Sequence, residues 1–278
     1  MESERDYVLG THDAEIERLG LQHRVWLPQA SRAWQRAGFT AGQQLVDLGC
    51  GPGYAALDLA GIAGPAGSVV AVDRSARFLA HLATQAAARG LHNVHGHELD
   101  LDRDPLPVTG ADGMWVRWVF SFVSRPRELL LRAAGALRPG GTIVLHEYVD
   151  YRAWRLSPRS EAFESFVSEV MASWRESGGE PDIALELPRW LGELGFEVLE
   201  MRLLARVARP SDFTWQWPRT FLNVGIERLL ELGRIDAAAA EAMRAGFDAA
   251  ETAPGAFLVA PTVLEIIARK RQGRRRAG

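Results

Sequence analysis

A short glycine-rich segment preceded by an acid is the part of the chain best suited to bind a ligand. It runs Asp47-Leu48-Gly49-Cys50-Gly51-Pro52-Gly53, and its glycines let the backbone turn tightly and approach a ligand closely. Tyr54 stands where the dinucleotide fingerprint GxGxxG requires a glycine, and no Gly-Lys-Ser/Thr of a P-loop follows. The acid would repel a pyrophosphate but attract an ammonium group. The segment therefore predicts a ligand with a cationic end.

Two more acidic residues follow the next two apolar runs of the chain. Asp73 ends the run at 69–72, 20 residues after the last glycine of the loop, and in doubly wound folds a carboxylate at this point binds ribose hydroxyls. Asp100 follows the run at 94–99, where its carboxylate and the N–H of Leu101 suit an adenine ring. Each acid alone is also typical of a helix cap or a loop. Three acids at three consecutive strand ends favour one ligand crevice.

An alternation of short apolar runs and helical patterns between residues 43 and 148 must position these acids. Such alternation is typical of βαβ units around a parallel sheet. Ligands bind outside the carboxyl ends of the strands in such sheets, so the loop and the acids are expected to share one crevice. The predicted strands are 44–48, 69–72, 94–99, 113–119 and 142–146.

The pattern changes after residue 150, where long helical segments interrupt the sheet. Apolar residues from Phe163 to Trp174 recur on one face of a predicted helix. We predict a sixth strand at 196–207 and a last strand at 256–260, with an extension through Ile267.

Four motifs in this order resemble the class I S-adenosylmethionine-dependent methyltransferases, in particular those that act on small molecules. They lie at 45–53, 69–73, 93–100 and 137–141, and the resemblance covers about residues 40–150. It implies an α/β, Rossmann-like, doubly wound fold with seven strands, the last of them antiparallel. It also implies an enzyme that uses S-adenosyl-L-methionine as its cofactor.

The resemblance further implies which residues hold this cofactor. Asp47 and the loop glycines would cradle the methionine part, and Arg117 matches a position whose backbone contacts the methionine amine. The N-terminal segment with Tyr7 and Gln22 is similar to the opening of small-molecule members, where it closes over the cofactor, although simple packing is an equal alternative. The predicted cofactor-binding residues are Asp47, Gly49, Gly51, Gly53, Asp73, Arg74, Asp100, Leu101, Arg117 and Tyr7.

Methyl transfer from a sulfonium is an in-line displacement, so alignment of the acceptor can supply much of the acceleration. A phenol or protonated amine also needs a base to take its proton. His146 and Glu147 end the fifth predicted strand beside the expected crevice, and we predict them as the catalytic residues, with His12 as a weaker candidate. The alternative is that this polar pair only satisfies a strand end.

Two helical insertions, at about 151–183 and 209–253, are predicted to cover the substrate. They hold four of the nine tryptophans of the chain and several phenylalanines. A largely apolar concave site is the usual design for an organic ligand, although an aromatic stripe on a helix is also typical of an ordinary core. We therefore predict an apolar or aromatic small-molecule acceptor, methylated on oxygen, nitrogen or carbon.

The chain of 278 residues is long enough for one large domain or two small ones. We predict a helical N-terminal cap at 1–40, a cofactor-binding core at 41–150 and a completing region at 151–278 within the same domain. The charged start lacks the layout of a signal peptide, and no apolar run reaches the length of a membrane span. These features predict a cytoplasmic protein with no membrane partner.

Composition argues against several other classes. The net charge of −3 provides no basic field for a nucleic acid, although residues 269–276 are mostly basic. A single cysteine, Cys50, has no partner for a disulfide or a zinc site, so no metal is predicted. The alternatives are a nucleic-acid or protein methyltransferase, a non-methylating enzyme that uses the same cofactor, and a non-catalytic cofactor-binding protein. The oligomeric state is left open, with a homodimer allowed.

Overall fold

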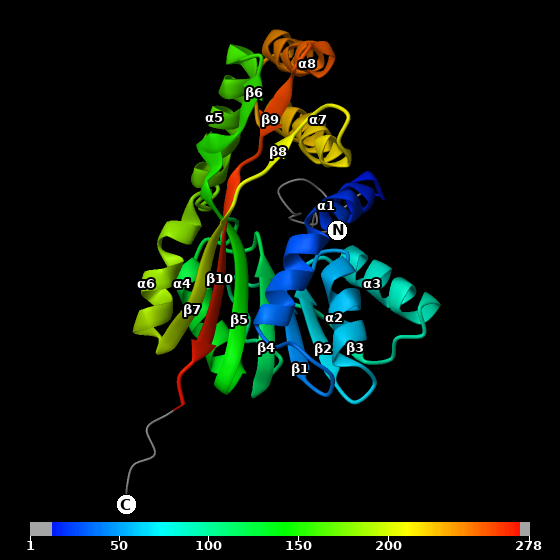
Figure 1. The fold of residues 1–278 in the computed structure, drawn as a ribbon, viewed down its shortest axis with the longest axis vertical. Helices are drawn as coiled ribbons and strands as arrows, with labels where there is room; N and C mark the ends of the chain where they lie inside the picture. Colours follow the sequence, from blue (N-terminus) through cyan, green and yellow to red (C-terminus); the bar gives the residue numbers. More distant parts are fainter. Residues whose placement is uncertain (1–12, 273–278) are drawn as a thin grey trace, which may run out of the picture.

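The computed structural model describes residues 13–272, and a seven-stranded sheet forms its centre (Figure 1). The strand order is β3-β2-β1-β4-β5-β10-β7. The first five strands are parallel, whereas β10 is antiparallel to both neighbours. The predicted Rossmann-like sheet with an antiparallel last strand is therefore confirmed. The strands are β1 (Gln44–Leu48), β2 (Ser68–Asp73), β3 (Val94–Glu98), β4 (Ala111–Arg117), β5 (Leu137–Asp150), β7 (Phe196–Leu204) and β10 (Thr262–Lys270).

Helices cover both faces of this sheet because consecutive strand residues point to opposite faces. Leu45 and Trp115 pack with one set of helices, and Val46 and Met114 pack with the other. One face carries α1 (Asp13–Arg36), α2 (Tyr54–Ala63) and α3 (Ala76–Ala88); the other carries α4 (Pro126–Ala136) and α6 (Leu187–Glu193) (Figure 1). Strands buried on both faces are accordingly apolar throughout.

A second lobe stands beyond one end of the main sheet, at the top of Figure 1. It contains a small antiparallel sheet in the order β6-β9-β8. We call this part the cap lobe. Its members are β6 (Arg155–Ser157), α5 (Glu161–Glu176), β8 (Val207–Ala208), α7 (Gln216–Glu231), α8 (Ala237–Thr252) and β9 (Phe257–Val259). Three short 3-10 helices, Tyr151–Ala153, Ile183–Leu185 and Phe213–Trp215, complete the described chain.

The end of the chain departs from the prediction. Residues 257–259 pair within the small sheet, and the last strand of the main sheet begins only at Thr262. Pro261 lies between the two strands and has no N–H to continue a ladder. The sixth strand likewise ends at Leu204, and β8 is separate. Strands of two or three residues are too short to leave a periodic signal, so the small sheet was not predicted.

The aromatic residues of the predicted cover mostly form the core of the cap lobe. Trp154, Phe163 and Phe247 are at most 2% exposed, and the rings of Trp154 and Phe163 meet edge to face at 5.2 Å. Phe163 and Phe247 also lie in contact, with centroids 5.9 Å apart. Among the aromatic and methionine side chains of the two insertions, only Trp174 and Phe221 line the main cavity; the others are Tyr151, Trp154, Phe163, Phe166, Met171, Phe213, Trp215, Trp217, Met243 and Phe247. The ordinary-core alternative therefore holds for most of them.

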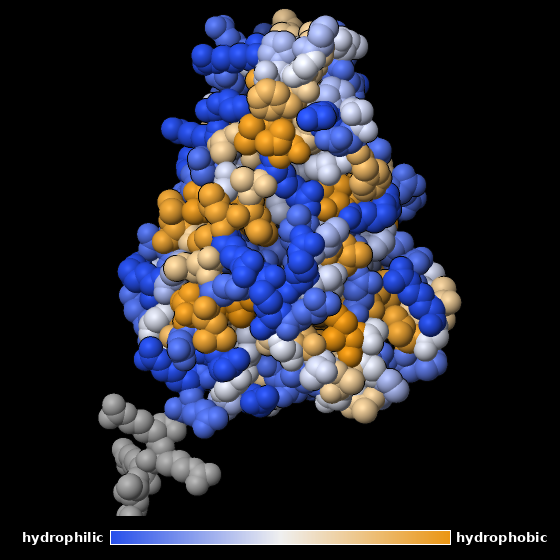
Figure 2. All heavy atoms as spheres, in the orientation of Figure 1, coloured by the Kyte–Doolittle hydropathy of each residue, from blue (hydrophilic) through white to orange (hydrophobic). Residues whose placement is uncertain are grey.

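The outer face of the main sheet edge is mixed in character. Leu199, Met201 and Leu203 of the edge strand β7 are 40–65% exposed, but Figure 2 shows apolar clusters separated by polar side chains over the viewed face.

Among the helices of residues 13–272, none has the length and apolarity needed to cross a bilayer.

The cap-lobe core predicts a stability difference between two phenylalanines. Phe247→Ala should lower the free energy of unfolding by about 3–5 kcal/mol, because it leaves a cavity among buried rings. Phe213→Ala, at a position that is 49% exposed, should change it by about 0.5 kcal/mol or less. Urea unfolding of both variants measures the difference. Equal losses would contradict the assignment of Phe247 to a packed core.

Candidate cofactor and acceptor cavity

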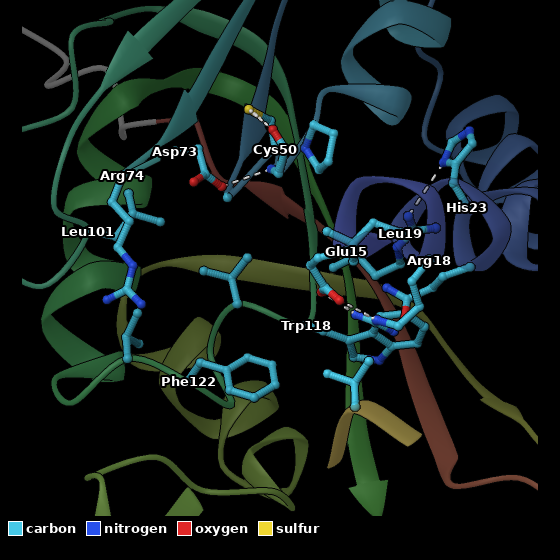
Figure 3. A pocket seen from close by; sticks show the side chains of 18 of the residues that line it. Glu15, Arg18, Leu19, His23, Cys50, Asp73, Arg74, Leu101, Trp118 and Phe122 are labelled. Atoms are coloured by element: carbon cyan, nitrogen blue, oxygen red, sulfur yellow. Dashed lines mark hydrogen bonds and ion pairs between the residues drawn. The ribbon is translucent and has the colours of Figure 1, made fainter. Parts of the chain in front are cut away.

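The main cavity has a volume of about 920 Å³ and lies at the carboxyl ends of β1, β2 and β4 (Figure 3). Its wall also includes α1 and α7. Eight of the ten predicted cofactor residues line it: Asp47, Gly49, Gly51, Asp73, Arg74, Asp100, Leu101 and Arg117. Gly53 lies just outside the lining, and Tyr7 lies outside the described residues.

In the glycine loop, Gly51 leaves room for a ligand, whereas Gly53 leaves room for a neighbouring helix. Gly51 has φ +55°, and a Cβ there would meet only Leu19, at 3.9 Å. Gly53 has φ +86°, and a Cβ there would lie 2.4 Å from Leu82 of α3. Gly51 thus opens the backbone toward the cavity, whereas Gly53 allows α2 to start against α3.

The Asp73 carboxylate fixes the shape of this loop. It accepts hydrogen bonds from the Gly51 N–H at 2.8 Å and from the Ser75 N–H at 2.9 Å. Ser75 in turn caps α3, since its hydroxyl accepts from the Phe78 N–H at 3.2 Å. One carboxylate therefore couples the loop after β1 to the end of β2.

Unlike Asp73, Asp47 has one carboxylate oxygen that lacks a hydrogen-bond partner within the described part of the chain. The side chain is buried, with 2% of its surface exposed, and it lines the cavity. The pKa of Asp47 is raised to about 7, mainly by burial, which is partly offset by the positive charge of Arg117 and reinforced by the negative charge of Asp73. A buried carboxylate with an open acceptor site suits a cationic group.

The far end of the cavity is formed by the segment after β3. Asp100, Leu101 and Asp102 line it, and Asp102 accepts hydrogen bonds from the N–H groups of Ser124 and Arg125, at 2.8 and 3.1 Å. These bonds hold the segment against the start of α4. Arg74 reaches the same end (Figure 3).

A polar chain at the opposite end was not predicted. His23 of α1 lies with its Nε2 2.8 Å from the Asp58 carboxylate, and Arg117 donates to its Nδ1 at 3.4 Å. Because arginine only donates, Nδ1 is the acceptor and Nε2 carries the proton. Burial lowers the pKa of His23. The ring also stacks on Tyr54, with centroids 5.9 Å apart.

The remaining wall is aromatic. Trp118 is 7% exposed and stacks on both Tyr148 and Trp217, with centroids 5.2 and 5.8 Å apart and planes within 11° of parallel. Phe122 meets Trp174 edge to face at 4.5 Å. These contacts pack the rings against one another along one side of the cavity. We call this part the aromatic wall.

Comparison with protein families and curated sequences points to one segment of the chain. The family model for a methyltransferase domain matches residues 45–141, from β1 to the start of β5. An uncharacterized 37.1 kDa protein in transposon TN4556 of Streptomyces fradiae is 33% identical over 109 residues. This match covers 38% of the chain and spans only 30% of the length of that relative.

Three solved structures share the fold, with sequence identities below a quarter. A putative methyltransferase from Bacillus halodurans has a TM-score of 0.60 at 18% identity, covering 87% of this chain and 98% of that one. Coclaurine N-methyltransferase bound to N-methylheliamine and S-adenosylhomocysteine has a TM-score of 0.56 at 17% identity, covering 88% and 72%. The [4+2]-cyclase SpnF has a TM-score of 0.56 at 23% identity, covering 88% and 81%.

The family match and the seven-stranded fold agree with each other. Residues 45–141 contain a methyltransferase domain, and the fold is that of the class I S-adenosylmethionine-dependent methyltransferases. The cofactor of such domains fits the groups of this cavity. Its ammonium group matches the open carboxylate oxygen of buried Asp47, and the bare backbone at Gly51 permits close approach. Asp73 and Asp100 line the cavity further along, at the ends of β2 and β3.

The geometry of the methyltransferase domain does not support a catalytic role for His146 or Glu147. Both side chains are fully buried, and neither lines the cavity. His146 Nε2 lies 2.9 Å from the Glu265 carboxylate of β10. Glu147 accepts hydrogen bonds from the N–H groups of Val119 and Phe120, at 2.8 and 3.1 Å, and from a serine hydroxyl. Both residues therefore fit the alternative considered above, that this polar pair satisfies the end of a strand.

Glu147 instead positions the segment that carries Trp118. By accepting those two N–H groups, it holds the chain immediately after β4, where Trp118 has the unusual φ of +52° for a residue other than glycine. Burial raises the pKa of Glu147 to about 7. The available sequence signal for this role was an acid near the end of one strand, together with an irregular turn after the neighbouring strand.

Several cavity residues escaped the sequence analysis because they come from α1. Glu15, Arg18 and His23 line the cavity, but they lie outside the recognised motifs. The three-residue spacing of Glu15 and Arg18, which places both on one face of a helix, was the available signal. Within residues 13–272, no group of three or more histidine, cysteine or acidic side chains has the arrangement of a metal site.

The positioning role of Glu147 predicts a loss of stability when its carboxylate is removed. Glu147→Ala should lower the free energy of unfolding by about 1–3 kcal/mol, because buried N–H groups lose their acceptor. His95→Ala, in a described and exposed part of β3, serves as the control and should change stability by about 0.5 kcal/mol or less. Urea unfolding measures both. A fully stable Glu147→Ala protein would contradict the positioning role.

Proposed function

We propose that the protein transfers the methyl group of S-adenosylmethionine to an apolar or aromatic small molecule. The observation that carries this proposal is the continuity of the cavity from the open carboxylate of Asp47 to the aromatic wall. Its volume of about 920 Å³ lies near the upper end of the range of roughly 300–1,000 Å³ for small-molecule sites. Such a cavity suits a cofactor and an acceptor side by side.

The cover over the cavity favours a small acceptor rather than a polymer. Helices α1 and α7 meet above it, where the Trp217 indole N–H donates to the Gln22 side chain at 3.0 Å. Arg206, immediately before β8 of the cap lobe, donates to the carbonyl of Val25 at 2.8 Å.

In the proposed mechanism, the residues of the chain mainly bind the cofactor and align the acceptor. The bound cofactor supplies an electrophilic methyl group on a sulfonium. Asp47 binds the ammonium end, and Asp73 keeps the loop in shape through Gly51. The aromatic wall holds the acceptor and excludes water, which favours a direct in-line approach to the methyl group. No side chain is assigned as a general base.

A second reading uses the same cavity without methyl transfer. The fold is similar to that of a [4+2]-cyclase, and the packed rings of the aromatic wall suit a reaction that depends on the shape of the site. The two candidate functions differ in their product, because only methyl transfer adds a CH2 group.

Incubation with S-adenosylmethionine and a panel of phenols, quinones and hydrophobic amines, followed by mass spectrometry, should give products heavier by one CH2 together with S-adenosylhomocysteine. Methylation of RNA or protein with none of this panel would overturn the proposal.

The raised pKa of Asp47 predicts that cofactor binding depends on pH. The ammonium group prefers the ionised carboxylate, and with a pKa of about 7 that form increases as the pH rises from 6 to 7.5. Affinity for S-adenosylhomocysteine should therefore rise about five- to tenfold over this interval. Isothermal titration calorimetry at each pH measures the change.

Asp47→Asn is the control for this dependence. It should weaken binding at pH 7.5 by about 1.5–3 kcal/mol, because a charge-assisted hydrogen bond is lost. It should also remove most of the pH dependence. An unchanged pH profile in the variant would show that another group titrates.

A further inference from the structure

The two edges of the main sheet differ in length and in the residues that they expose. β3, at one edge, has five residues, and those that it exposes are a histidine, a glycine and a glutamate. β7, at the other edge (Figure 1), has nine residues without a proline, and it exposes Leu199, Met201 and Leu203 at 40%, 55% and 65%. Within residues 13–272, no further strand pairs with β7. Because proteins usually shorten or charge edges whose N–H and C=O groups are free to pair with other chains, β7 has the features of an interface strand.

The sequence at the middle of β7 is symmetric about Met201. It reads Leu199-Glu200-Met201-Arg202-Leu203, so opposite charges lie on either side of Met201 and leucines lie beyond them. In an antiparallel pair of β7 strands with a two-fold axis at Met201, Glu200 of each strand stands opposite Arg202 of the other. An axis moved by one residue would place Glu200 opposite Glu200 or Arg202 opposite Arg202, and like charges in that position are destabilising. Charge therefore favours one register of a strand with its own copy.

The two charged side chains are placed for such a contact. Arg202 Nη2 donates to one carboxylate oxygen of Glu200 at 2.7 Å, and Arg36 of α1 donates to the other at 2.6 Å, so both charges lie on the α1 face of the sheet. The Arg202 side chain is 52% exposed and can reach a second carboxylate. The pairing of β7 with β10 is regular from Glu200 to Leu204 and shifts between Val198 and Glu200. The charged residues therefore lie in the regular part of the strand.

We propose that the protein forms a homodimer in which the β7 strands of two copies pair antiparallel about a two-fold axis at Met201, so that the two main sheets join into one. Because the same edge of each copy is used, the assembly closes at two chains. Met201 and Leu203 point to the face opposite to the charges, where they gain apolar contacts with the second copy. No residue of β7 lines the main cavity, so the dimer is independent of the proposed function.

The mass of the full chain in solution, measured by sedimentation equilibrium, tests the dimer. The wild-type protein should have the mass of two chains at micromolar concentration. Met201→Lys places two positive charges opposite each other at the axis and should weaken the dimer at least about tenfold. Leu131→Lys introduces the same charge on α4, at a position that is 57% exposed, and should leave the mass unchanged. A monomeric wild-type protein, which would leave the edge to a strand of another protein, would overturn the proposal, as would a dimer that survives Met201→Lys.

Two charge reversals test the register. Arg202→Glu places acids opposite acids and Glu200→Arg places bases opposite bases, so each variant alone should dimerise at least about tenfold more weakly than wild type. In an equimolar mixture every reversed side chain meets its opposite charge, so a heterodimer should form with nearly the wild-type affinity. Recovery on mixing also shows that both variants are folded. A mixture that stays monomeric, or a single variant that dimerises like wild type, would overturn this register and the proposal with it.

Disulfide formation reports the position of the axis directly. Opposite residues of antiparallel strands have Cα atoms roughly 4.5–5.5 Å apart, within the range of roughly 4.4–6.8 Å that a disulfide bridges. Met201→Cys should therefore cross-link two copies under mild oxidation, whereas Leu203→Cys, which stands opposite Leu199, should not. The wild-type protein controls for the native Cys50, and mass spectrometry of the linked peptide identifies the bridge. Equal cross-linking by Leu203→Cys would contradict the proposed pairing.

Discussion

The shape of the cavity depends on a cluster of tryptophans that joins three distant parts of the chain. Trp26 of α1 is fully buried and meets both Trp118, which follows β4, and Trp217 of α7 edge to face at 5.3 Å. Trp118 and Trp217 stack on each other. Edge-to-face and stacked rings have narrow geometric preferences and bury large apolar areas. The cluster therefore fixes the N-terminal helix, the main sheet and the cap lobe around one space.

Two buried carboxylates at this space show how environment separates residues of similar type. Burial raises the pKa of both Asp47 and Glu147 to about 7. Glu147 is surrounded by donors from the segment after β4, so its work is structural. Asp47 has an oxygen without a partner in the described chain and faces the cavity, so it has an acceptor site open to a ligand. The difference lies in the neighbours, because the two groups titrate alike.

The side of the cavity around Asp47 and the glycine loop was largely predictable, because its residues lie in motifs whose backbone geometry is local. A glycine loop after a strand, and acids at the ends of the next two strands, must meet at one edge of a parallel sheet. The opposite side of the cavity was not predictable in the same way. His146 and Glu147 are near the same edge in sequence, but the pleat and the pairing with β10 direct them into the interior. The aromatic insertions mostly pack on themselves, so that Trp174 and Phe221 reach the cavity while Trp154 does not.

By itself, the sequence determined the class of fold, the family resemblance and the position of the glycine loop, because these depend on short-range periodicity and on glycine positions. Only the tertiary structure decided which side chains line the side of the cavity away from that loop. Glu15 and Arg18 come from α1, Trp118 follows β4 and Phe221 comes from α7, and they are brought together by packing between elements about 200 residues apart. Such contacts leave no periodic signal in one sequence, because each residue also satisfies the ordinary pattern of its own helix or strand.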